Sequence, residues 1–250
     1  MQKYDNIVII GATSAIAEHC ARIWIAENPM EITLVGRNVD KLNLISADLA
    51  TRSVSTKVTT KTLDFLDVKQ IEACIERCVN ETSPDLVLIA HGSLPDQLKC
   101  QSDPTLIEEA LKINAISPII FAEGFANRMP QNRLSTIIVL GSVAGDRGRK
   151  SNYIYGSAKS LIEKYTQGLQ HRFAGSKVNI ILVKPGPTET PMTAHMVGVK
   201  RNFASVEEVA KSIVYRAKKL EPVIYVPIKW AAIMLVIRNL PKFVFSKLDI

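Results

Sequence analysis

Four polar side chains in this sequence have the types and the spacing that proton transfer requires. Tyr155 and Lys159 stand four residues apart in a helical stretch, so the phenol and the ammonium share one helix face. Ser142 ends a strand thirteen residues before Tyr155. Asn114 interrupts an otherwise apolar helix, where it is functional, marks a kink or is a satisfied core amide. An ammonium about 4 Å from a phenol is worth roughly 4 kcal/mol at an effective dielectric of about 20. That interaction lowers the phenol pKa by up to about 3 units and prepares Tyr155 to exchange a proton.

The elements that must position these side chains alternate between short β-branched runs and longer helical patterns. Strands are expected at 6–10, 31–35, 57–63, 85–90, 135–140, 177–183 and 223–226, and helices at 14–27, 38–49, 67–81, 104–129, 155–173 and 206–220. Pro118 predicts a kink or a break in the helix over 104–129. The alternation predicts an α/β fold: a doubly wound parallel sheet of the Rossmann type, three α/β/α layers in a single domain over residues 1–250. Its ligand should lie beyond the carboxyl ends of the strands.

Composition and charge narrow the class of protein. The 250 residues are 47% hydrophobic, which supplies a core and excludes long disorder. The net charge of +7 favours anionic partners. Basic residues do not alternate with aromatic ones along one element, so nucleic acid is not expected. The four cysteines and four histidines show no metal-ligand spacing, so we expect reduced thiols and no metal. The N-terminus runs directly into a strand, which predicts no signal peptide and a cytoplasmic protein.

The turn after the first strand suits the pyrophosphate of a dinucleotide. It reads Gly11-Ala12-Thr13-Ser14-Ala15-Ile16-Ala17, and the helix that follows offers its N-terminus to an anion. Only Gly11 is a glycine, and Ala15 and Ala17 stand where a glycine-rich fingerprint has two more. Alone, this segment is equally an ordinary strand-to-helix turn. The candidate cofactor-binding residues here are Gly11, Thr13, Ser14, Ala15 and Ile16.

Charged residues after the next two strands indicate which dinucleotide would bind. Sites for NAD usually carry an acid at the end of the second strand, whereas this chain has Arg37 there, with no acid beside it. A guanidinium fits a 2′-phosphate, so NADP is favoured over the alternative that Arg37 is a solvated charge at the start of a helix. Asp64 follows the third strand. It either accepts a hydrogen bond from the adenine amine or caps the next helix.

Together these motifs resemble those of the short-chain dehydrogenases/reductases, the single-domain type of this length. The resemblance runs from the first strand to about Met192, and the Ser142, Tyr155 and Lys159 set is its most specific part. It implies that Ser142 orients the substrate carbonyl and stabilises the oxyanion, and that Tyr155 is the general acid in reduction and the base in oxidation. It also implies that Lys159 holds the nicotinamide ribose and lowers the phenol pKa, while Asn114 carries a proton-relay water.

Two further loops extend the resemblance to the nicotinamide end. The segment Lys184-Pro185-Gly186-Pro187-Thr188-Glu189-Thr190 is similar to the family's loop after the sixth strand. There Pro185 and Gly186 would line the nicotinamide, Thr188 would meet the carboxamide through its backbone, and Thr190 would reach the pyrophosphate. The segment Ile89-Ala90-His91-Gly92 stands where the family commonly has Asn-Asn-Ala-Gly. We expect Ala90, His91 and Gly92 to border the cofactor, with His91 a tolerated loop residue rather than a functional variant.

The C-terminal segment 228–248 departs from a plain catalytic domain because it is both apolar and basic. Between residues 222 and 248 there are four basic residues and no acidic one: Lys229, Arg238, Lys242 and Lys247. The apolar run from Trp230 to Ile237 is far shorter than the ~20 residues needed to span a bilayer. A helix of this composition lies in a membrane interface, or packs on a neighbouring subunit of a homodimer or homotetramer; both interpretations stay open. The tail also resembles that of the decaprenylphosphoryl-2-keto-pentose reductase-like subgroup, bacterial members of the family that reduce a keto-sugar on a polyprenyl phosphate.

The loop Asp146-Arg147-Gly148-Arg149-Lys150 brings three cations close to Ser142. These cations hold a substrate phosphate, or they form a solvated loop. We therefore predict an NADP(H)-dependent oxidoreductase that reduces a ketone to an alcohol, with a keto-sugar on a lipid phosphate as the more specific substrate. The alternatives are a 3-oxoacyl thioester reductase and a non-enzyme, an NADP-sensing or membrane-adaptor protein. The expected partner is a small-molecule or lipid-linked carbonyl compound. Membrane contact through 228–248 would make the protein peripheral on the inner membrane face.

Overall fold

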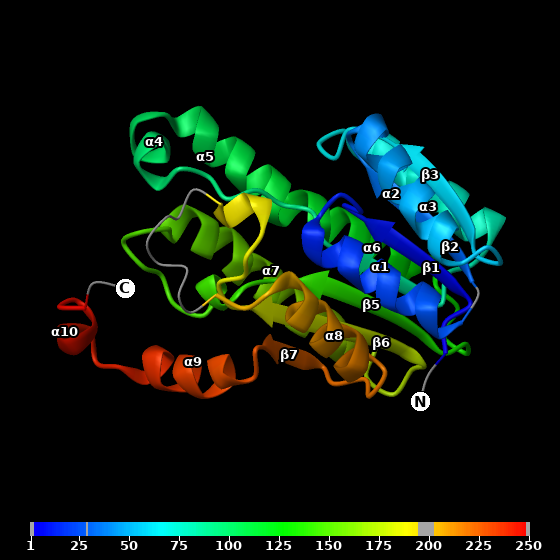
Figure 1. The fold of residues 1–250 in the computed structure, drawn as a ribbon. Coiled ribbons are helices and arrows are strands. Elements are labelled where there is room, and N and C mark those ends of the chain that lie inside the picture. Colours follow the sequence, from blue (N-terminus) through cyan, green and yellow to red (C-terminus); the bar gives the residue numbers. More distant parts are fainter. Residues whose placement is uncertain (1–2, 29, 195–202, 249–250) are drawn as a thin grey trace.

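A parallel β-sheet forms the centre of the protein. The computed structural model describes residues 3–28, 30–194 and 203–248 (Figure 1). Within these residues seven strands pair in the order β3-β2-β1-β4-β5-β6-β7, and every pair is parallel. The strands are β1 (Asn6–Ile10), β2 (Glu31–Gly36), β3 (Lys57–Thr62), β4 (Leu86–Ile89), β5 (Ser135–Leu140), β6 (Val178–Pro185) and β7 (Val223–Val226). The crossover between β3 and β4 reverses the winding, which confirms the predicted doubly wound, Rossmann-type fold.

Helices cover both faces of this sheet and create two cores. One face carries α1 (Ala15–Glu27), α2 (Val39–Arg52) and α8 (Val206–Ala217), and the other carries α3 (Val68–Glu81), α6 (Ser117–Arg128) and α7 (Tyr153–Arg172). Side chains of a strand point alternately to the two faces, so Ile7 and Ile9 enter the first core while Val8 and Ile10 enter the second. This double burial explains why the strands read as continuous apolar runs.

The single helix predicted over 104–129 is divided into three parts. It consists of α5 (Pro104–Leu111), a π-helical turn η1 (Lys112–Ile116) and α6. Ser117 N donates to Lys112 O five residues earlier, which is the π pattern. Pro118 lies in the first turn of α6, where its missing N–H is tolerated. The predicted break is therefore confirmed, but it is a continuous widened turn that precedes the proline.

Short elements that periodicity did not predict border the carboxyl ends of the strands. They are α4 (Gln97–Ser102), capped by Asp96, and two 3-10 turns, η2 (Val143–Gly145) and η3 (Pro191–Thr193). The tail forms α9 (Lys229–Asn239) and α10 (Lys242–Phe245), which extend beyond β7 (Figure 1). Among the described residues, none of the helices combines the length and apolar character that crossing a membrane requires.

Candidate active site

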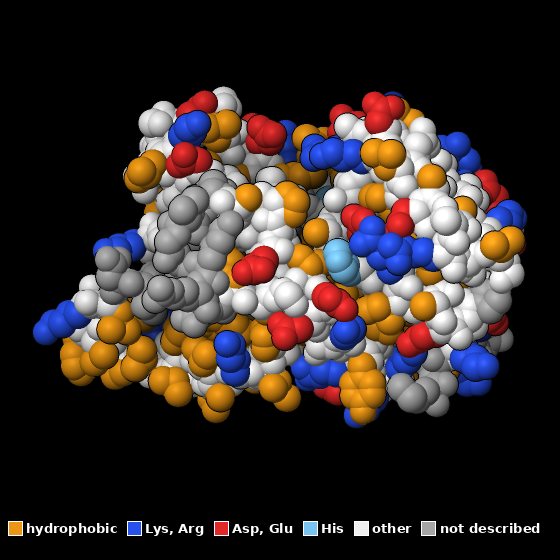
Figure 2. Space-filling view, viewed as in Figure 1, with side chains coloured by type: hydrophobic (Ala, Val, Ile, Leu, Met, Phe, Trp, Pro, Cys, Tyr) orange, Lys and Arg blue, Asp and Glu red, His pale blue; other side chains and the backbone are white. Residues whose placement is uncertain are grey.

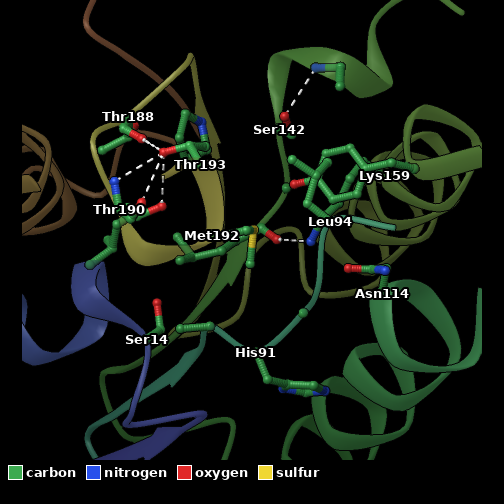
Figure 3. A pocket seen from close by; sticks show the side chains of 18 of the residues that line it. Ser14, His91, Leu94, Asn114, Ser142, Lys159, Thr188, Thr190, Met192 and Thr193 are labelled. Atoms are coloured by element: carbon green, nitrogen blue, oxygen red, sulfur yellow. Dashed lines mark hydrogen bonds between the residues drawn. The ribbon is translucent and has the colours of Figure 1, made fainter. Parts of the chain in front are cut away.

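A cavity of about 340 Å³ opens where the loops after β1, β2, β4, β5 and β6 meet, at the carboxyl ends of the strands. Every predicted site residue except Asp64 lines it. These are Gly11, Thr13, Ser14, Ala15, Ile16, Arg37, Ala90, His91, Gly92, Asn114, Ser142, Tyr155, Lys159, Pro185, Gly186, Thr188 and Thr190. Figure 3 shows Asn114 and Lys159 on one side of this space, across from Thr188, Thr190 and Thr193. Its described lining includes three cationic side chains, those of Arg37, Arg149 and Lys159, and no carboxylate.

Gly11 gives the first loop a shape that no other residue would allow. Its φ of +81° is in the left-handed region, and a Cβ there would lie 2.6 Å from His91 N. The turn leads into α1, and the side chain of Ser14 at the helix N-cap makes no capping hydrogen bond. The first-turn N–H groups next to the cavity therefore suit an anion. The turn thus accommodates Ala15 at a position where the glycine-rich fingerprint has a second glycine.

Ser142 and Tyr155 form the reactive end of the cavity. Ser142 follows β5, and its Oγ accepts a hydrogen bond from Ala144 N at 3.1 Å. Tyr155 in α7 is half-buried, and Ser142 is the hydrogen-bonding group that acts on its phenol. Lys159 lies one turn later on the same face, as predicted, and its Nζ donates to Leu140 O at 3.0 Å. The helix, the strand end and the turn η2 thus bring hydroxyl, phenol and ammonium together.

The expected lowering of the Tyr155 pKa by Lys159 is wrong for this structure. Burial raises the pKa of Tyr155 to about 12, and only the Ser142 hydrogen bond opposes it. The Lys159 Nζ lies 5.7 Å from the centroid of the Tyr155 ring and is directed at Leu140 O. Burial also lowers the pKa of Lys159 to about 8. Removal from water, which sequence spacing does not reveal, is the main cause of both pKa shifts. Near neutral pH the phenol is protonated and most of the amine is charged.

Asn114 owes its orientation to the π turn. Its Nδ2 donates to Ala110 O at 2.9 Å, a carbonyl that an α-helix would use for the backbone. Its Oδ1 accepts from Ser93 N at 2.9 Å and so anchors the loop after β4. A Cβ at Gly92 would lie 2.7 Å from this oxygen and 3.7 Å from Lys159 Nζ. Gly92 therefore lets Asn114 and Lys159 border the same space.

His91 is a buried neutral ring and not a ligand-facing side chain. Its Nε2 hydrogen-bonds to Ser117 Oγ at 2.9 Å, and its ring packs against Phe65 and Phe121 at centroid distances of 4.5 and 5.6 Å. Burial, with the charges of Lys159 and Arg37, lowers its pKa to about 3. This agrees with the interpretation of His91 as a tolerated loop residue, which contributes backbone to the cavity and a side chain to the core.

Asp64 is not among the residues that line the cavity. Its Oδ1 accepts a hydrogen bond from Leu66 N at 2.9 Å within its own exposed loop. The alternative prediction, that Asp64 caps the next helix, is wrong, because Asp67 accepts from Lys69 N and Gln70 N at the start of α3. The residue that lines the cavity after β3 is Phe65.

The loop after β6 is braced by the tail helix. Thr188 Oγ1 donates to Gly186 O at 2.9 Å, and Thr193 Oγ1 donates to the carbonyls of Thr188 and Thr190. A Cβ at Gly186 would overlap the indole nitrogen of Trp230 in α9. The absence of a side chain at Gly186 therefore allows α9 to pack directly on a wall of the cavity.

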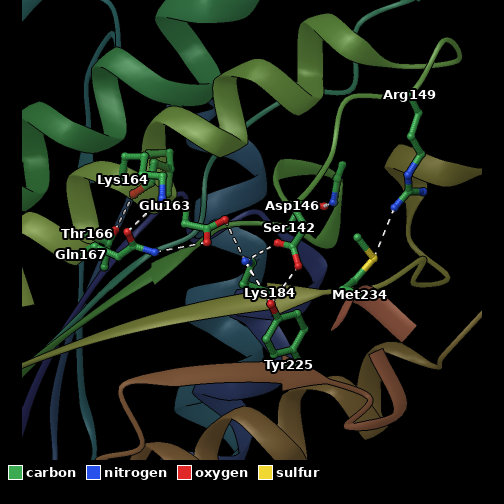
Figure 4. A network of polar contacts seen from close by, with 12 residues as sticks. Ser142, Asp146, Arg149, Glu163, Lys164, Thr166, Gln167, Lys184, Tyr225 and Met234 are labelled. Atoms are coloured by element: carbon green, nitrogen blue, oxygen red, sulfur yellow. Dashed lines mark hydrogen bonds and ion pairs between the residues drawn. The ribbon is translucent and has the colours of Figure 1, made fainter. Parts of the chain in front are cut away.

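A buried cluster of charges lies behind Ser142 (Figure 4). Lys184 in β6 is only 1% exposed, and its Nζ donates to Glu163 Oε2 at 2.8 Å and pairs with Asp146. Tyr225 of β7 donates to Asp146 Oδ2 at 2.8 Å. Burial lowers the pKa of Lys184, but the hydrogen bonds and charges of Asp146 and Glu163 outweigh it and raise the pKa overall.

The basic loop 146–150 is not a uniform phosphate clamp. Arg147 points to the tail, where its Nη1 donates to Ile237 O at 2.6 Å and Leu240 O at 2.7 Å. Asp146 belongs to the buried cluster. Only Arg149 of the predicted cations lines the cavity; its Nη2 contacts Met234 Sδ at 3.7 Å. Of the three cations that the sequence places in this loop, the structure therefore brings one, Arg149, into the cavity lining.

Several lining residues were missed by the sequence analysis. They include Asn152, which precedes Tyr155 by three residues, and Leu94, Met192 and Thr193. Asn152 lies one helical turn before Tyr155, and that spacing is a signal that could have identified it. Leu94 gives none, because it stands in a loop without periodicity.

Known proteins agree with this architecture. Residues 5–200 match the family described as short chain dehydrogenase. An uncharacterized oxidoreductase of Streptomyces coelicolor is 27% identical over 243 residues, which cover 97% of this chain and 95% of the relative. A solved short chain dehydrogenase from Burkholderia cenocepacia J2315, in complex with NADP, has a TM-score of 0.82 at 16% identity and covers 100% of both chains. One from Sphingobium yanoikuyae, in complex with NADPH, has a TM-score of 0.81 at 21% identity, covering 98% of this chain and 96% of that chain.

The fold and the site thus define a Rossmann-type oxidoreductase. Because the family match spans most of its length, the chain belongs to the short-chain dehydrogenase family.

The buried neutral state of His91 predicts an acid-sensitive fold. Its pKa of about 3 in the folded protein lies below the unfolded value of about 6.5, so the unfolded state binds more protons between these pH values. Stability from this group is complete above pH ~6.5 and falls by up to about 1.4 kcal/mol per pH unit as the pH drops toward 3. Urea unfolding at several pH values should show a shallower acid slope for His91→Gln. His171→Gln, at an exposed position, should keep the wild-type slope. Identical slopes for wild type and His91→Gln would contradict the assignment.

Proposed function

We propose that this protein is an NADP(H)-dependent oxidoreductase that interconverts a ketone and an alcohol. One observation carries the proposal: Ser142, Tyr155, Lys159 and Asn114 line the same cavity as the Gly11 turn and Arg37. One cavity therefore joins an anion-binding helix start to a proton donor. The NADP and NADPH in the two solved relatives support this choice of cofactor.

The lining fits the cofactor at each of its parts. Ser14, Ala15 and Ile16 would hold the pyrophosphate at the start of α1, and Arg37 would hold the 2′-phosphate. Lys159 would hold the nicotinamide ribose, with Pro185, Gly186 and Thr188 beside the ring. When bound, the cofactor supplies or accepts the hydride. The described lining offers no carboxylate for a free 2′-hydroxyl, which favours NADP over NAD.

Tyr155 is in the correct protonation state for reduction. With a pKa of about 12 the phenol is neutral at pH 7 and can donate its proton to a carbonyl oxygen. Ser142 Oγ donates a second hydrogen bond to that oxygen as negative charge develops on it. The Lys159 Nζ, which is mostly charged at pH 7, lies 5.7 Å from the centroid of the ring on which this phenolate forms. In oxidation the same proton moves in the opposite direction.

Tyr155→Phe tests the reaction. The variant keeps the ring and loses the proton donor, so turnover of NADPH with a ketone panel should fall by about 10²–10⁴-fold while NADPH affinity changes little. Fluorescence titration measures the binding and absorbance measures the turnover. Tyr153→Phe, at the exposed start of α7, is the matched control. Unchanged turnover in Tyr155→Phe refutes the mechanism. Tight NADPH binding without turnover in the wild type would instead favour the sensor or adaptor protein.

Arg37 tests the choice of cofactor separately. Arg37→Asp removes the guanidinium and offers a carboxylate to a ribose hydroxyl, so NADP(H) affinity should fall by about tenfold or more, with NAD(H) retained. Isothermal titration with both cofactors measures the ratio. Lys41→Asp, an exposed cation of α2 that does not line the cavity, should leave the ratio unchanged. Equal loss of both cofactors would mean that Arg37 does not contact the phosphate.

For the substrate we propose an anionic ketone, with a keto-sugar on a lipid phosphate as its most specific form. The support is local to Arg149 and Asn152, two lining residues that have buried polar atoms without a partner, Nε and Oδ1 respectively. Burial lowers the pKa of the Arg149 guanidinium, although Asp146 opposes this effect. A substrate phosphate would supply the hydrogen bonds that this guanidinium lacks. The 3-oxoacyl thioester remains a sequence-based alternative, and direct competition between the two ketones would separate them.

Arg149→Met tests this substrate class. Loss of a charged hydrogen bond of about 1.5–3 kcal/mol should raise KM about tenfold to a hundredfold for a phosphorylated keto-sugar. KM for a neutral ketone of similar size should stay within about twofold, and kcat should change little for both. Lys150→Met, whose side chain does not line the cavity, serves as the control. An equal rise in KM for both ketones would show that Arg149 only shapes the wall.

A further inference from the structure

The outer side of α9 and α10 carries exposed apolar side chains, which we call the tail surface: Ile228, Leu235, Val236 and Phe243. Their exposed fractions are 71%, 57%, 61% and 71%. Figure 2 shows apolar side chains gathered on this end of the molecule, where Figure 1 places the two helices. Single exposed apolar residues are ordinary on a protein, but a contiguous group of this kind marks an interaction site.

Helix α9 is apolar on two opposite faces, and only one of them packs on the protein. Trp230, Met234 and Ile237 recur at helical spacing on the inner face, where Met234 is fully buried. Leu235, and Ile228 at the N-cap of the helix seven residues earlier, lie on the opposite side. A surface helix needs one apolar face to hold it in place, so the second face indicates a second apolar environment.

Arg147 holds α9 in an orientation that leaves this second face exposed to solvent. Its guanidinium donates to the carbonyls of Ile237 and Leu240 at the end of α9. It also lies 3.9 Å from the ring centroid of Phe245 in α10. These contacts satisfy the helix end and complement its dipole. The tail surface is therefore a preformed face on a held helix, and its outer side chains are not available to turn into the core.

The charges around the tail surface identify its partner. Lys229, Arg238, Lys242 and Lys247 are all exposed, and the segment 222–248 contains no acidic residue. Two copies of this face, joined by a two-fold axis, would place like charges opposite one another, and the described tail up to residue 248 has no carboxylate to compensate them. An anionic bilayer suits both the apolar and the basic side chains of the tail. The apolar side chains enter the membrane interface, and the basic side chains bind the anionic headgroups.

We propose that the tail surface binds an anionic phospholipid bilayer and holds the cavity at the membrane. The inner face of α9 touches two cavity walls, since Met234 contacts Arg149 and Trp230 packs at Gly186. A helix with its side chains is about 10 Å wide, so the cavity wall lies about one helix diameter from the bilayer. A lipid-linked ketone would reach the site from there. The docking itself does not depend on the proposed reaction.

Vesicle flotation of the intact protein tests the docking without any measurement of turnover. We expect at least tenfold more bound protein on vesicles of phosphatidylcholine with phosphatidylglycerol than on phosphatidylcholine alone, and a decrease with added salt. The double variant Leu235→Glu/Val236→Glu should lose at least tenfold of the binding. The matched control Leu44→Glu, at a position 71% exposed on α2, should bind like the wild type. Lys242→Glu/Lys247→Glu should also lose binding, whereas Lys177→Glu should keep most of it.

Three outcomes would overturn the proposal. They are no flotation with anionic vesicles, equal flotation with both vesicle types, and equal loss in the Leu44→Glu control. Sedimentation equilibrium of the wild type and of Leu235→Glu/Val236→Glu tests the alternative that a second copy of the chain covers this surface. Self-association that Leu235→Glu/Val236→Glu abolishes, together with no vesicle binding, would assign the face to a second copy of the chain. Thermal unfolding and NADPH titration of each variant show whether it remains folded. If vesicles bind but NADPH is never oxidised, the reductase proposal fails and the docking stands.

Discussion

The buried ammonium of Lys184 is the constraint on which the catalytic arrangement depends. An ammonium removed from water is stable only with carboxylates around it, and here Asp146 and Glu163 come from two different elements. Asp146 lies four residues after Ser142, and Glu163 lies one turn after Lys159 on α7. One charge in β6 thereby sets the distance between the strand end and the helix that together carry the reactive groups. Tyr225 extends the same cluster to β7, from which the tail helix begins.

Acidic side chains gather in the buried cluster around Lys184, whereas basic side chains line the cavity, and this separation favours the binding of anions. The carboxylates of this region face Lys184, while the described cavity lining retains Arg37, Arg149 and Lys159 without an acidic neighbour in it. The cavity is therefore positive overall and suits phosphate groups. Burial also sets the protonation of the reactive groups. It raises the pKa of Tyr155, which keeps the phenol neutral, and it lowers the pKa of Lys159. The result is a site in which the Tyr155 phenol has a proton to donate and the Lys159 ammonium supplies positive charge beside it.

The sequence predicted the features that follow from local spacing. Strand positions, the shared face of Tyr155 and Lys159, and the loops that line the cavity all follow from periodicity and from the rule that parallel strands end at one edge. Contacts between distant segments could not be predicted in this way. The partner of Arg147 is a helix end about ninety residues later, and the bond from Ser93 to Asn114 needs a π turn that propensity does not encode. The pKa directions at the site also required burial, which is a property of the folded protein.

The contact between Trp230 and Gly186 gives the protein an internal optical reporter. The chain has two tryptophans, and Trp24, a residue of α1, is buried in the core. Trp230 is partly exposed and packs against the loop after β6. Its emission therefore senses both the polarity at the inner side of α9 and any ligand that settles on that loop. Occupancy of the cavity and attachment of the tail can be followed by the intrinsic fluorescence of one indole, without a dye.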